Sequence, residues 1–164
     1  MKKYRLTEET TKVGNRTLYR IQALRDFGNV KEGDIGGYIE SEKNLSQDGN
    51  AWVSGNAWVS GDARVYGNAR VSGNACVYGN ARVYGNADIK TTGDICSMSG
   101  FGSEYRTTTA FRTKNGDVHV SCGCFQGNLE AFCQRVESTH GNNLYGREYK
   151  KMIEMLKIHF EVEP

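Results

Sequence analysis

The sequence predicts a mainly β protein, in which a short parallel β-helix lies between an N-terminal β-hairpin cap and a C-terminal ββαα module. Three observations lead to this fold class. Twenty of the 164 residues are Gly and only one is Pro, a composition typical of repeats. Residues 49–90 repeat in hexads, and alternating segments with turn signals flank the repeat. We expect the cap at 1–36, the β-helix at 37–96 and the C-terminal module at 97–164.

Residues 1–36 are interpreted as the hairpin cap. Two stretches, KKYRLTEETTKV and RTLYRIQALRDF, alternate between polar and apolar residues on either side of Gly14-Asn15. Both turn residues tolerate left-handed backbone angles, so the pair indicates a tight turn. Such a hairpin would cover one end of the β-helix, where backbone groups otherwise lack partners.

The repeat consists of seven hexads in phase, which read GNAWVS, GNAWVS, GDARVY, GNARVS, GNACVY, GNARVY and GNADIK. Residues two apart in an extended chain face the same side, so the Ala and the Val or Ile of each hexad point inward. The following Gly-Asn or Gly-Asp supplies the turn. An eighth hexad, TTGDIC, keeps only its aliphatic residue Ile95, and residues 37–48 fit loosely, with Ile39 and Leu45 in the alanine position.

Two architectures satisfy this period. Each hexad is either one side of a triangular parallel β-helix with three hexads per coil, or one short strand of an antiparallel meander. The coil stacks every Val on the Val three hexads later and closes its own core. The meander would be a wide, thin sheet with little to cover it, so the sequence favours the coil.

The hexads of residues 49–96 resemble those of the hexapeptide-repeat family, whose members form left-handed parallel β-helices and usually homotrimers. The left hand is implied by this resemblance alone, because general crossover statistics favour the opposite hand. Residues 26–53, DFGNVKEGDIGGYIESEKNLSQDGNAWV, are similar to the opening of phage- and prophage-associated hexapeptide proteins loosely described as acetyltransferase-like or polymer-forming. This second resemblance implies a phage context without assigning a chemistry.

The C-terminal segment predicts two strands followed by two helices. SEYRTTTAFRT and DVHVSCGCF alternate on either side of a loop that contains Asn115-Gly116, a strong hairpin signal. The stretch NLEAFCQRVESTHG has Asn128 as a cap, apolar residues at helical spacing and Gly141 as its stop. A second helix, REYKKMIEMLKIHF, places Tyr149, Met152, Ile153, Leu156 and Phe160 on one face.

Composition narrows the partners and the compartment. The net charge is +2, with 21 Lys and Arg against 19 Asp and Glu, so bulk nucleic-acid binding is not expected. The first residues turn polar where a secretory signal needs an apolar stretch, and no run is long enough for a membrane span. We therefore expect a cytoplasmic protein, in the host bacterial cytosol if phage-encoded, that does not bind membranes. The five cysteines are interpreted as reduced thiols.

Catalysis by the coils is not indicated. The three histidines, His119, His140 and His159, all lie in the C-terminal module, whereas resemblance to hexapeptide enzymes would place histidine beside the coils. We expect no cofactor and no metal. The alternative zinc ligands are His119, Cys122, Cys124 and Cys133. Their spacing favours core and surface roles, because His119 points away from Cys122 and Cys124 on an alternating strand.

The outward residues of the coils supply the candidate sites. Outward side chains three hexads apart stack on one face, so Arg64 lies over Arg82 and Tyr66 over Tyr84, and Arg70 lies on an adjoining face. Guanidinium groups beside aromatic rings suit phosphate, carboxylate or a nucleobase, although Arg and Tyr are also ordinary exterior residues of β structure. Trp52 and Trp58 would be outward and apolar, which indicates an oligomer interface.

Three functions follow from these features. The first is a non-catalytic phage-type homo-oligomer that binds a ligand or partner and inhibits bacterial antiphage defence, either as a sponge for an anionic nucleotide signal or by masking a host defence protein. The second is a structural or assembly module of a virion. The third is an acyltransferase-like enzyme that uses His119 or His140 of a neighbouring subunit.

Overall fold

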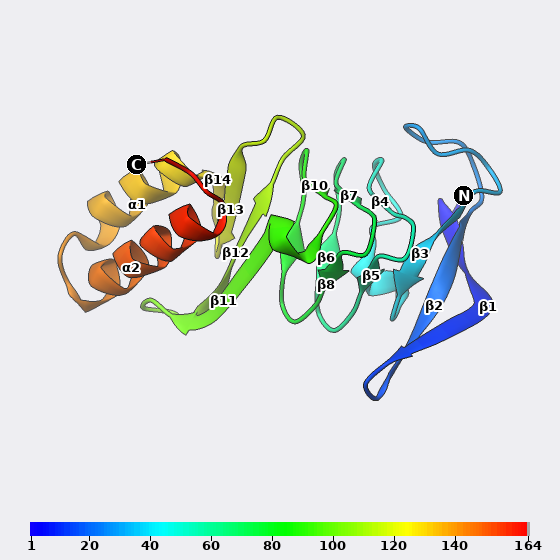
Figure 1. The fold of residues 1–164 in the computed structure, drawn as a ribbon, viewed down its shortest axis with the longest axis horizontal. Helices are drawn as coiled ribbons and strands as arrows, with labels where there is room; N and C mark the ends of the chain where they lie inside the picture. The colour runs from blue at the N-terminus through cyan, green and yellow to red at the C-terminus, as the bar shows by residue number, and fades with distance from the viewer. Residues whose placement is uncertain (164) are drawn as a thin grey trace. The chain divides into compact units, whose positions relative to one another are not determined.

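The computed structural model describes residues 1–163, and the chain divides into two compact units, Met1–Thr92 and Gly93–Pro164 (Figure 1). The first unit contains the hairpin and the repeat. The second contains an antiparallel sheet and two helices. The protein is therefore mainly β, with its helices confined to the second unit except for short 3-10 turns.

The N-terminal hairpin consists of β1 (Tyr4–Val13) and β2 (Arg16–Ala23). Val13 pairs with Arg16 across the turn, where Gly14 has a φ of 59°. Strand β3 (Ile35–Ile39) pairs antiparallel with β2 on one side and parallel with β5 (Trp58–Val59) on the other. The hairpin is thus continuous with one face of the coils, in a sheet of order β1-β2-β3-β5-β8.

The hexads form a parallel solenoid of three faces. Each contributes a two-residue strand, and strands three hexads apart pair in parallel. One face is β4-β7-β10, the second includes β5-β8 and the third is β6-β9 (Figure 1). This pairing confirms the coil of three hexads and excludes the antiparallel meander. The remaining strands are β4 (Trp52–Val53), β6 (Arg64–Val65), β7 (Arg70–Val71), β8 (Cys76–Val77), β9 (Arg82–Val83) and β10 (Asp88–Ile89).

The seven hexads bury their small and their branched side chains in the interior of the coils. Every repeat Ala from Ala51 to Ala87 and every repeat aliphatic residue from Val53 to Ile89 is at most 1% exposed. Backbone hydrogen bonds join successive coils, as where Trp52 N donates to Ala69 O at 3.0 Å. The glycines that open the seven hexads, from Gly49 to Gly85, have φ between 61° and 70°, which explains why the turn position is always Gly.

The first coil is longer than the others. Ile39 pairs with Val59 and Leu45 with Val65, so both lie two positions further from their partners than three hexads would place them. Ile39 and Leu45 therefore stack on the valines of the next coil, and not on its alanines as the unbroken six-residue spacing had predicted. The two extra residues fall between Leu45 and Asn50. The regular spacing has returned at Asn50, because its backbone N–H donates to Gly67 O just as that of Asn56 donates to Gly73 O. Between Leu45 and Asn50, the Gln47 side chain accepts hydrogen bonds from the backbone N–H of Lys3 and Tyr4, at 2.8 and 3.3 Å, which fixes the start of β1.

The eighth hexad is not a coil. Ile95 begins β11 (Ile95–Phe101), which pairs antiparallel with β12 (Arg106–Arg112). The sheet continues through β13 (Val118–Cys122) to β14 (Phe125–Asn128). The predicted ββαα module therefore has four strands, because TTGDIC and the residues after Cys122 each begin one more.

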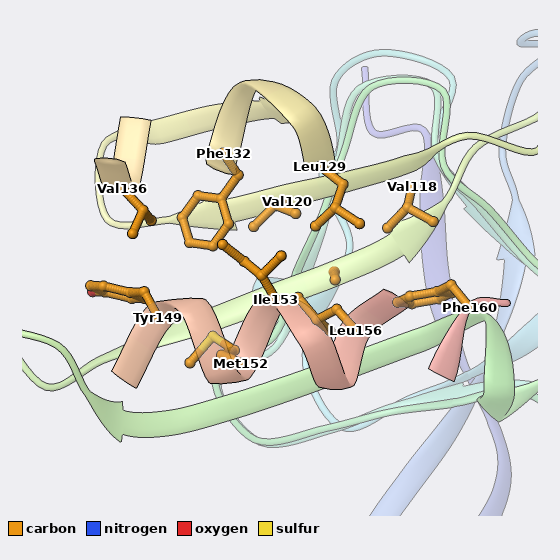
Figure 2. Close-up of a cluster of buried hydrophobic side chains, with 11 residues drawn as sticks. Val118, Val120, Leu129, Phe132, Val136, Tyr149, Met152, Ile153, Leu156 and Phe160 are labelled. Carbon is orange, nitrogen blue, oxygen red and sulfur yellow. The ribbon is translucent and has the colours of Figure 1, made fainter. Parts of the chain in front are cut away.

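Helices α1 (Leu129–His140) and α2 (Leu144–His159) complete the second unit. Asn128 caps α1 by accepting a hydrogen bond from Ala131 N, and Gly141, with a φ of 53°, ends it. Asn143 caps α2 in the same way, through Gly146 N. Figure 2 shows side chains of α1, α2 and β13 pointing toward one another. The buried cluster comprises Ala110, Val118, Val120, Leu129, Phe132, Val136, Tyr149, Met152, Ile153, Leu156 and Phe160.

Between residues 1 and 163, no helix combines the length and the apolar character that crossing a membrane requires.

Candidate functional site

Arginine and tyrosine side chains form a ladder on the β6-β9 face. Arg64 pairs directly with Arg82 in the parallel register, and both side chains are exposed. Two residues further along each coil, the rings of Tyr66 and Tyr84 stack with centroids 5.6 Å apart and planes 20° from parallel. The coil geometry therefore brings together four of the five residues that the sequence indicated for ligand binding.

Three residues of the ladder, Arg64, Tyr66 and Arg82, line a groove of about 320 Å³. One wall is the β6-β9 face, and the other is the end of the first coil, where Leu45 pairs with Val65. Asn44 holds this wall in place, because its buried side-chain amide donates to Gly61 O at 3.0 Å and Ala63 O at 2.9 Å. The lining residues are Glu42, Lys43, Leu45, Ser46, Gln47, Arg64, Val65, Tyr66 and Arg82.

Cationic groups outnumber anionic ones in the groove. Arg64, Arg82 and Lys43 face a single lining carboxylate, Glu42. Glu42 forms an ion pair with Lys2 at 2.7 Å, and Lys43 pairs with Asp62 at 2.9 Å. The hydrogen bond from Lys43 lowers the pKa of Asp62, so that pair stays ionised at neutral pH. The four charged residues of the lining together carry a net charge of +2, from three cationic side chains and one carboxylate.

Tyr84 acts as a neutral group. Burial, followed by proximity to Tyr66, raises the pKa of Tyr84 to about 12. Its phenol therefore keeps its proton at neutral pH and adds no negative charge beside the arginines. Stacked aromatic rings next to guanidinium groups offer both a planar apolar surface and charged donors.

Arg70 lies apart from this groove. It pairs in register with Trp52 on one side and Asp88 on the other, on the β4-β7-β10 face. Its guanidinium is close to Gly28, where a Cβ would lie 3.2 Å from Nη2. The structure therefore does not place Arg70 with Arg64 and Arg82.

Trp52 is buried, which corrects its prediction as an exposed interface residue. Its side chain is 3% exposed, and its ring has edge contacts with Tyr4 at 6.3 Å and Phe27 at 5.3 Å. The start of β1 and the loop after β2 cover it within the same chain. Trp58 is only partly buried and packs against Tyr78, with ring centroids 6.0 Å apart, and Tyr78 is 59% exposed.

The alternative zinc ligands do not converge. The His119 ring packs against Phe111, with centroids 6.2 Å apart, whereas Cys122 Sγ accepts a hydrogen bond from the Thr108 hydroxyl at 3.2 Å. Cys133 packs against the hydrophobic core, and Cys124 is exposed. Across the part of the chain that the structure describes, no three His, Cys, Asp or Glu side chains form a group that could hold a metal ion.

Sequence reasoning missed the wall opposite the ladder. Lys43, Ser46 and Gln47 line the groove, but the first coil fits the hexad pattern too loosely to show which of its residues face β6. One signal could have found them. Ile39 and Leu45 are large aliphatic residues one hexad apart, and matching them to the valines of the hexads, not to the alanines, gives the register that the structure has.

Parallel pairing at intervals of three hexads, an Ala and Val interior and glycine turns make the repeat of this chain a parallel β-solenoid of the hexapeptide type. The family model described as YdcK Beta solenoid repeat matches residues 63–77 and 75–87. The chain is also similar to the "Uncharacterized acetyltransferase YdcK" of Escherichia coli (strain K12), with 39% identity over 61 residues. That match covers 32% of this chain and 19% of the relative, so the chain spans about a fifth of the length of the protein it matches.

Proposed function

We propose that this protein is a non-catalytic, phage-type homo-oligomer that binds an anionic nucleotide in the Arg64–Arg82 groove and thereby inhibits antiphage defence. One observation carries the proposal: two arginines in register line one groove together with Tyr66, whose ring stacks on that of Tyr84. Arginine binds phosphate through paired N–H donors, and an aromatic ring accepts a base by stacking. The coils are proposed to wind left-handed, as the family resemblance implies.

The size of the groove fits a small ligand. A volume of about 320 Å³ lies near the lower end of the roughly 300–1,000 Å³ typical of small-molecule sites. The groove is built on paired strands and on the anchored Asn44, so its walls are fixed before a ligand arrives. Preformed sites lose less entropy on binding, which suits a protein that must sequester a ligand.

Binding of nucleotides to the wild-type protein tests the proposal. We expect one or more members of a panel of mononucleotides and cyclic oligonucleotides to bind in isothermal titration calorimetry. In the Arg64→Ala/Arg82→Ala protein, Kd should rise at least about 100-fold, because each lost charged hydrogen bond is worth about 1.5–3 kcal/mol. Arg5→Ala is the matched control, since Arg5 is exposed in the same unit and bonds to Gln22.

Other outcomes would favour the remaining functions. If no nucleotide binds, or if the double arginine variant and wild type bind equally, the groove is not the site. Capture of a host defence protein without any nucleotide would favour masking of a partner. Turnover of acetyl-CoA would favour an acyltransferase, the activity class in the name of the YdcK relative.

A further inference from the structure

A second cavity lies within the C-terminal unit, at the end of its hydrophobic core. The helix-facing side of the sheet runs through the pairs Ala110 with Val120 and Thr108 with Cys122. Beyond these pairs the same side of β12 continues to Arg106, and Cys124 lies in the turn between β13 and β14; neither belongs to the buried cluster. The last turns of α1 and Tyr149 of α2 close the cavity, which has a volume of about 210 Å³. Figure 2 shows Phe132, Val136 and Tyr149 together at this end of the core.

Two arginines line this cavity. Arg106 lies against Gly123, where a Cβ would overlap the guanidinium, so glycine at this turn leaves the space that the arginine needs. Arg135 lies over the ring of Phe125, with Cζ 5.8 Å from the centroid. Considering residues 1–163, neither arginine takes part in an ion pair. Both charges are available to a ligand.

Neutral donors complete the lining. The Tyr149 hydroxyl lies 3.7 Å from Cys122 Sγ, and its ring stacks on His140 with centroids 5.6 Å apart. Gly102 makes room for this hydroxyl, because a Cβ there would overlap it. Burial raises the pKa of Tyr149, so the phenol stays protonated and can donate a hydrogen bond.

The charged and apolar residues that line the cavity indicate the chemical class of its ligand. Arg106 and Arg135 line the cavity with a single carboxylate, Glu104, so these three side chains together carry one net positive charge. Phe125, Phe132 and Val136 provide an apolar surface beside it. The volume is below the roughly 300 Å³ at which drug-sized sites begin. We propose that this cavity binds a small monocarboxylate, with its carboxylate between Arg106 and Arg135 and its short apolar part against Phe125 and Phe132.

Two cysteines in the lining make the proposal testable by affinity labelling. Iodoacetate is itself a small carboxylate, and it alkylates thiols as the neutral iodoacetamide does. In both reactions the sulfur forms a bond to the CH₂ carbon, iodide leaves with the C–I electron pair, and the thiol proton goes to solvent. The two reagents are compared at Cys122 and Cys124 with Cys76, a partly buried thiol of the N-terminal unit, as the reference.

The measured quantity is the rate with iodoacetate divided by the rate with iodoacetamide, followed at each cysteine by peptide mass spectrometry. Because the ratio cancels differences in thiol reactivity, it reports recognition of the carboxylate. We expect the ratio at Cys124 to exceed that at Cys76 by about tenfold, the effect of one charged hydrogen bond. Sodium butyrate should slow iodoacetate labelling of Cys124 and leave Cys76 unchanged.

The matched variants are Arg106→Gln/Arg135→Gln and Arg147→Gln, the latter an exposed arginine of α2 outside the cavity. The double variant should lose the excess ratio, whereas Arg147→Gln should keep it. Equal ratios at all cysteines of the wild-type protein would overturn the proposal even if the double variant failed to fold. Protection by inorganic phosphate as strong as that by butyrate would overturn the choice of a monocarboxylate. Neither result depends on the groove of the N-terminal unit, so the nucleotide proposal is tested separately.

Discussion

At the scale of single residues, Lys3 is the most unusual side chain of the N-terminal unit. It is fully buried, and its ammonium donates to Ala51 O at 2.8 Å and lies 5.0 Å from the centre of the Phe27 ring. Burial, and then the charges of Arg25 and Arg70, lower the pKa of Lys3 to about 8. The charged form is therefore less favourable in the folded chain than in the unfolded one.

The pH dependence of stability follows from this shift. Between pH 8 and about 10.4, the unfolded chain keeps the Lys3 proton while the folded chain has released it, so the free energy of unfolding rises with pH. The slope is at most about 1.4 kcal/mol per pH unit for one proton. Burial raises the pKa of Tyr4, which makes stability fall above about pH 10. Burial also raises the pKa of Cys96, whose thiol ionises near pH 9 in the unfolded chain and so lowers stability within the same window. The contribution of Lys3 is therefore separated by comparison with a variant that lacks its ammonium group.

Urea unfolding of wild type and Lys3→Met at pH 7, 8, 9 and 10 measures this effect. Methionine has no charge to desolvate, so its stability relative to wild type should decrease as pH rises from 8 to 10. The comparison with Lys3→Met cancels the titration of other groups. Parallel stability curves for the two proteins across this window would contradict the assignment of the shift to Lys3.

Some residue-scale contacts were predictable from the sequence and others were not. The stacking of Tyr66 on Tyr84 and the register of Arg64 on Arg82 follow from the period of three hexads, and the structure has both. The burial of Trp52 does not follow from any local pattern, because Phe27 and Tyr4 cover it from segments that are distant in the sequence. The Trp52 side chain points away from the interior of the coils, as its position in the hexad predicts, but Tyr4 and Phe27 cover it in the folded chain.

At the scale of elements, the turns between coils differ in how much space surrounds them. Gly73 and Gly85 have nearly equal φ values of 64° and 61°. A Cβ at Gly73 would overlap the carbonyl oxygen of Lys90, whereas a Cβ at Gly85 would meet nothing within 4 Å. The two positions therefore separate backbone strain from steric overlap.

We expect Gly85→Ala to cost about 1–2 kcal/mol, from the left-handed backbone conformation alone. Gly73→Ala should cost that amount plus about 1–3 kcal/mol for the shift of the Lys90 backbone. Thermal and urea unfolding of the two variants checks the difference. Equal losses would show that the coils move apart freely at Gly73.

The elements that follow the strict hexad were predictable, and those that depart from it were not. Ile95 continues the aliphatic spacing of the hexads, so the pattern assigned it to a coil, but its backbone pairs with Phe111. The longer first coil was hidden because its extra residues carry no periodicity of their own. They are recognisable only through Gln47, which binds the backbone of Lys3 and Tyr4.

At the scale of the whole molecule, self-association is the central proposal. The β3-β5-β8 face aligns Tyr38, Trp58 and Cys76 in register, and Tyr78 extends beside Trp58. Trp and Tyr are enriched in protein interfaces, where their large rings bury much apolar area. Since Trp52 is covered by its own chain, Trp58 is the tryptophan that a second copy would contact.

Sedimentation equilibrium of wild type and Trp58→Ser tests this assignment. We expect a trimer for wild type and at least about a tenfold weaker association for Trp58→Ser, the effect of a modest interface residue. Tyr105→Ser is the control, because Tyr105 is an aromatic residue that is 70% exposed in the other unit. An unaltered trimer in Trp58→Ser would place the interface elsewhere, and a monomeric wild type would refute self-association.

The pairing of each coil with the next makes the length of this solenoid a counted quantity. An insertion or loss of three hexads would shift every later side chain by one full rung and leave it in its own column. A change of one hexad between Tyr66 and Arg82 would instead carry every later side chain to the neighbouring column, and would separate Arg64 from Arg82 and Tyr66 from Tyr84. Duplication of hexads can therefore lengthen such a protein in any number, but a duplication between the coils that form a binding surface keeps their side chains in one column only when it adds hexads in threes.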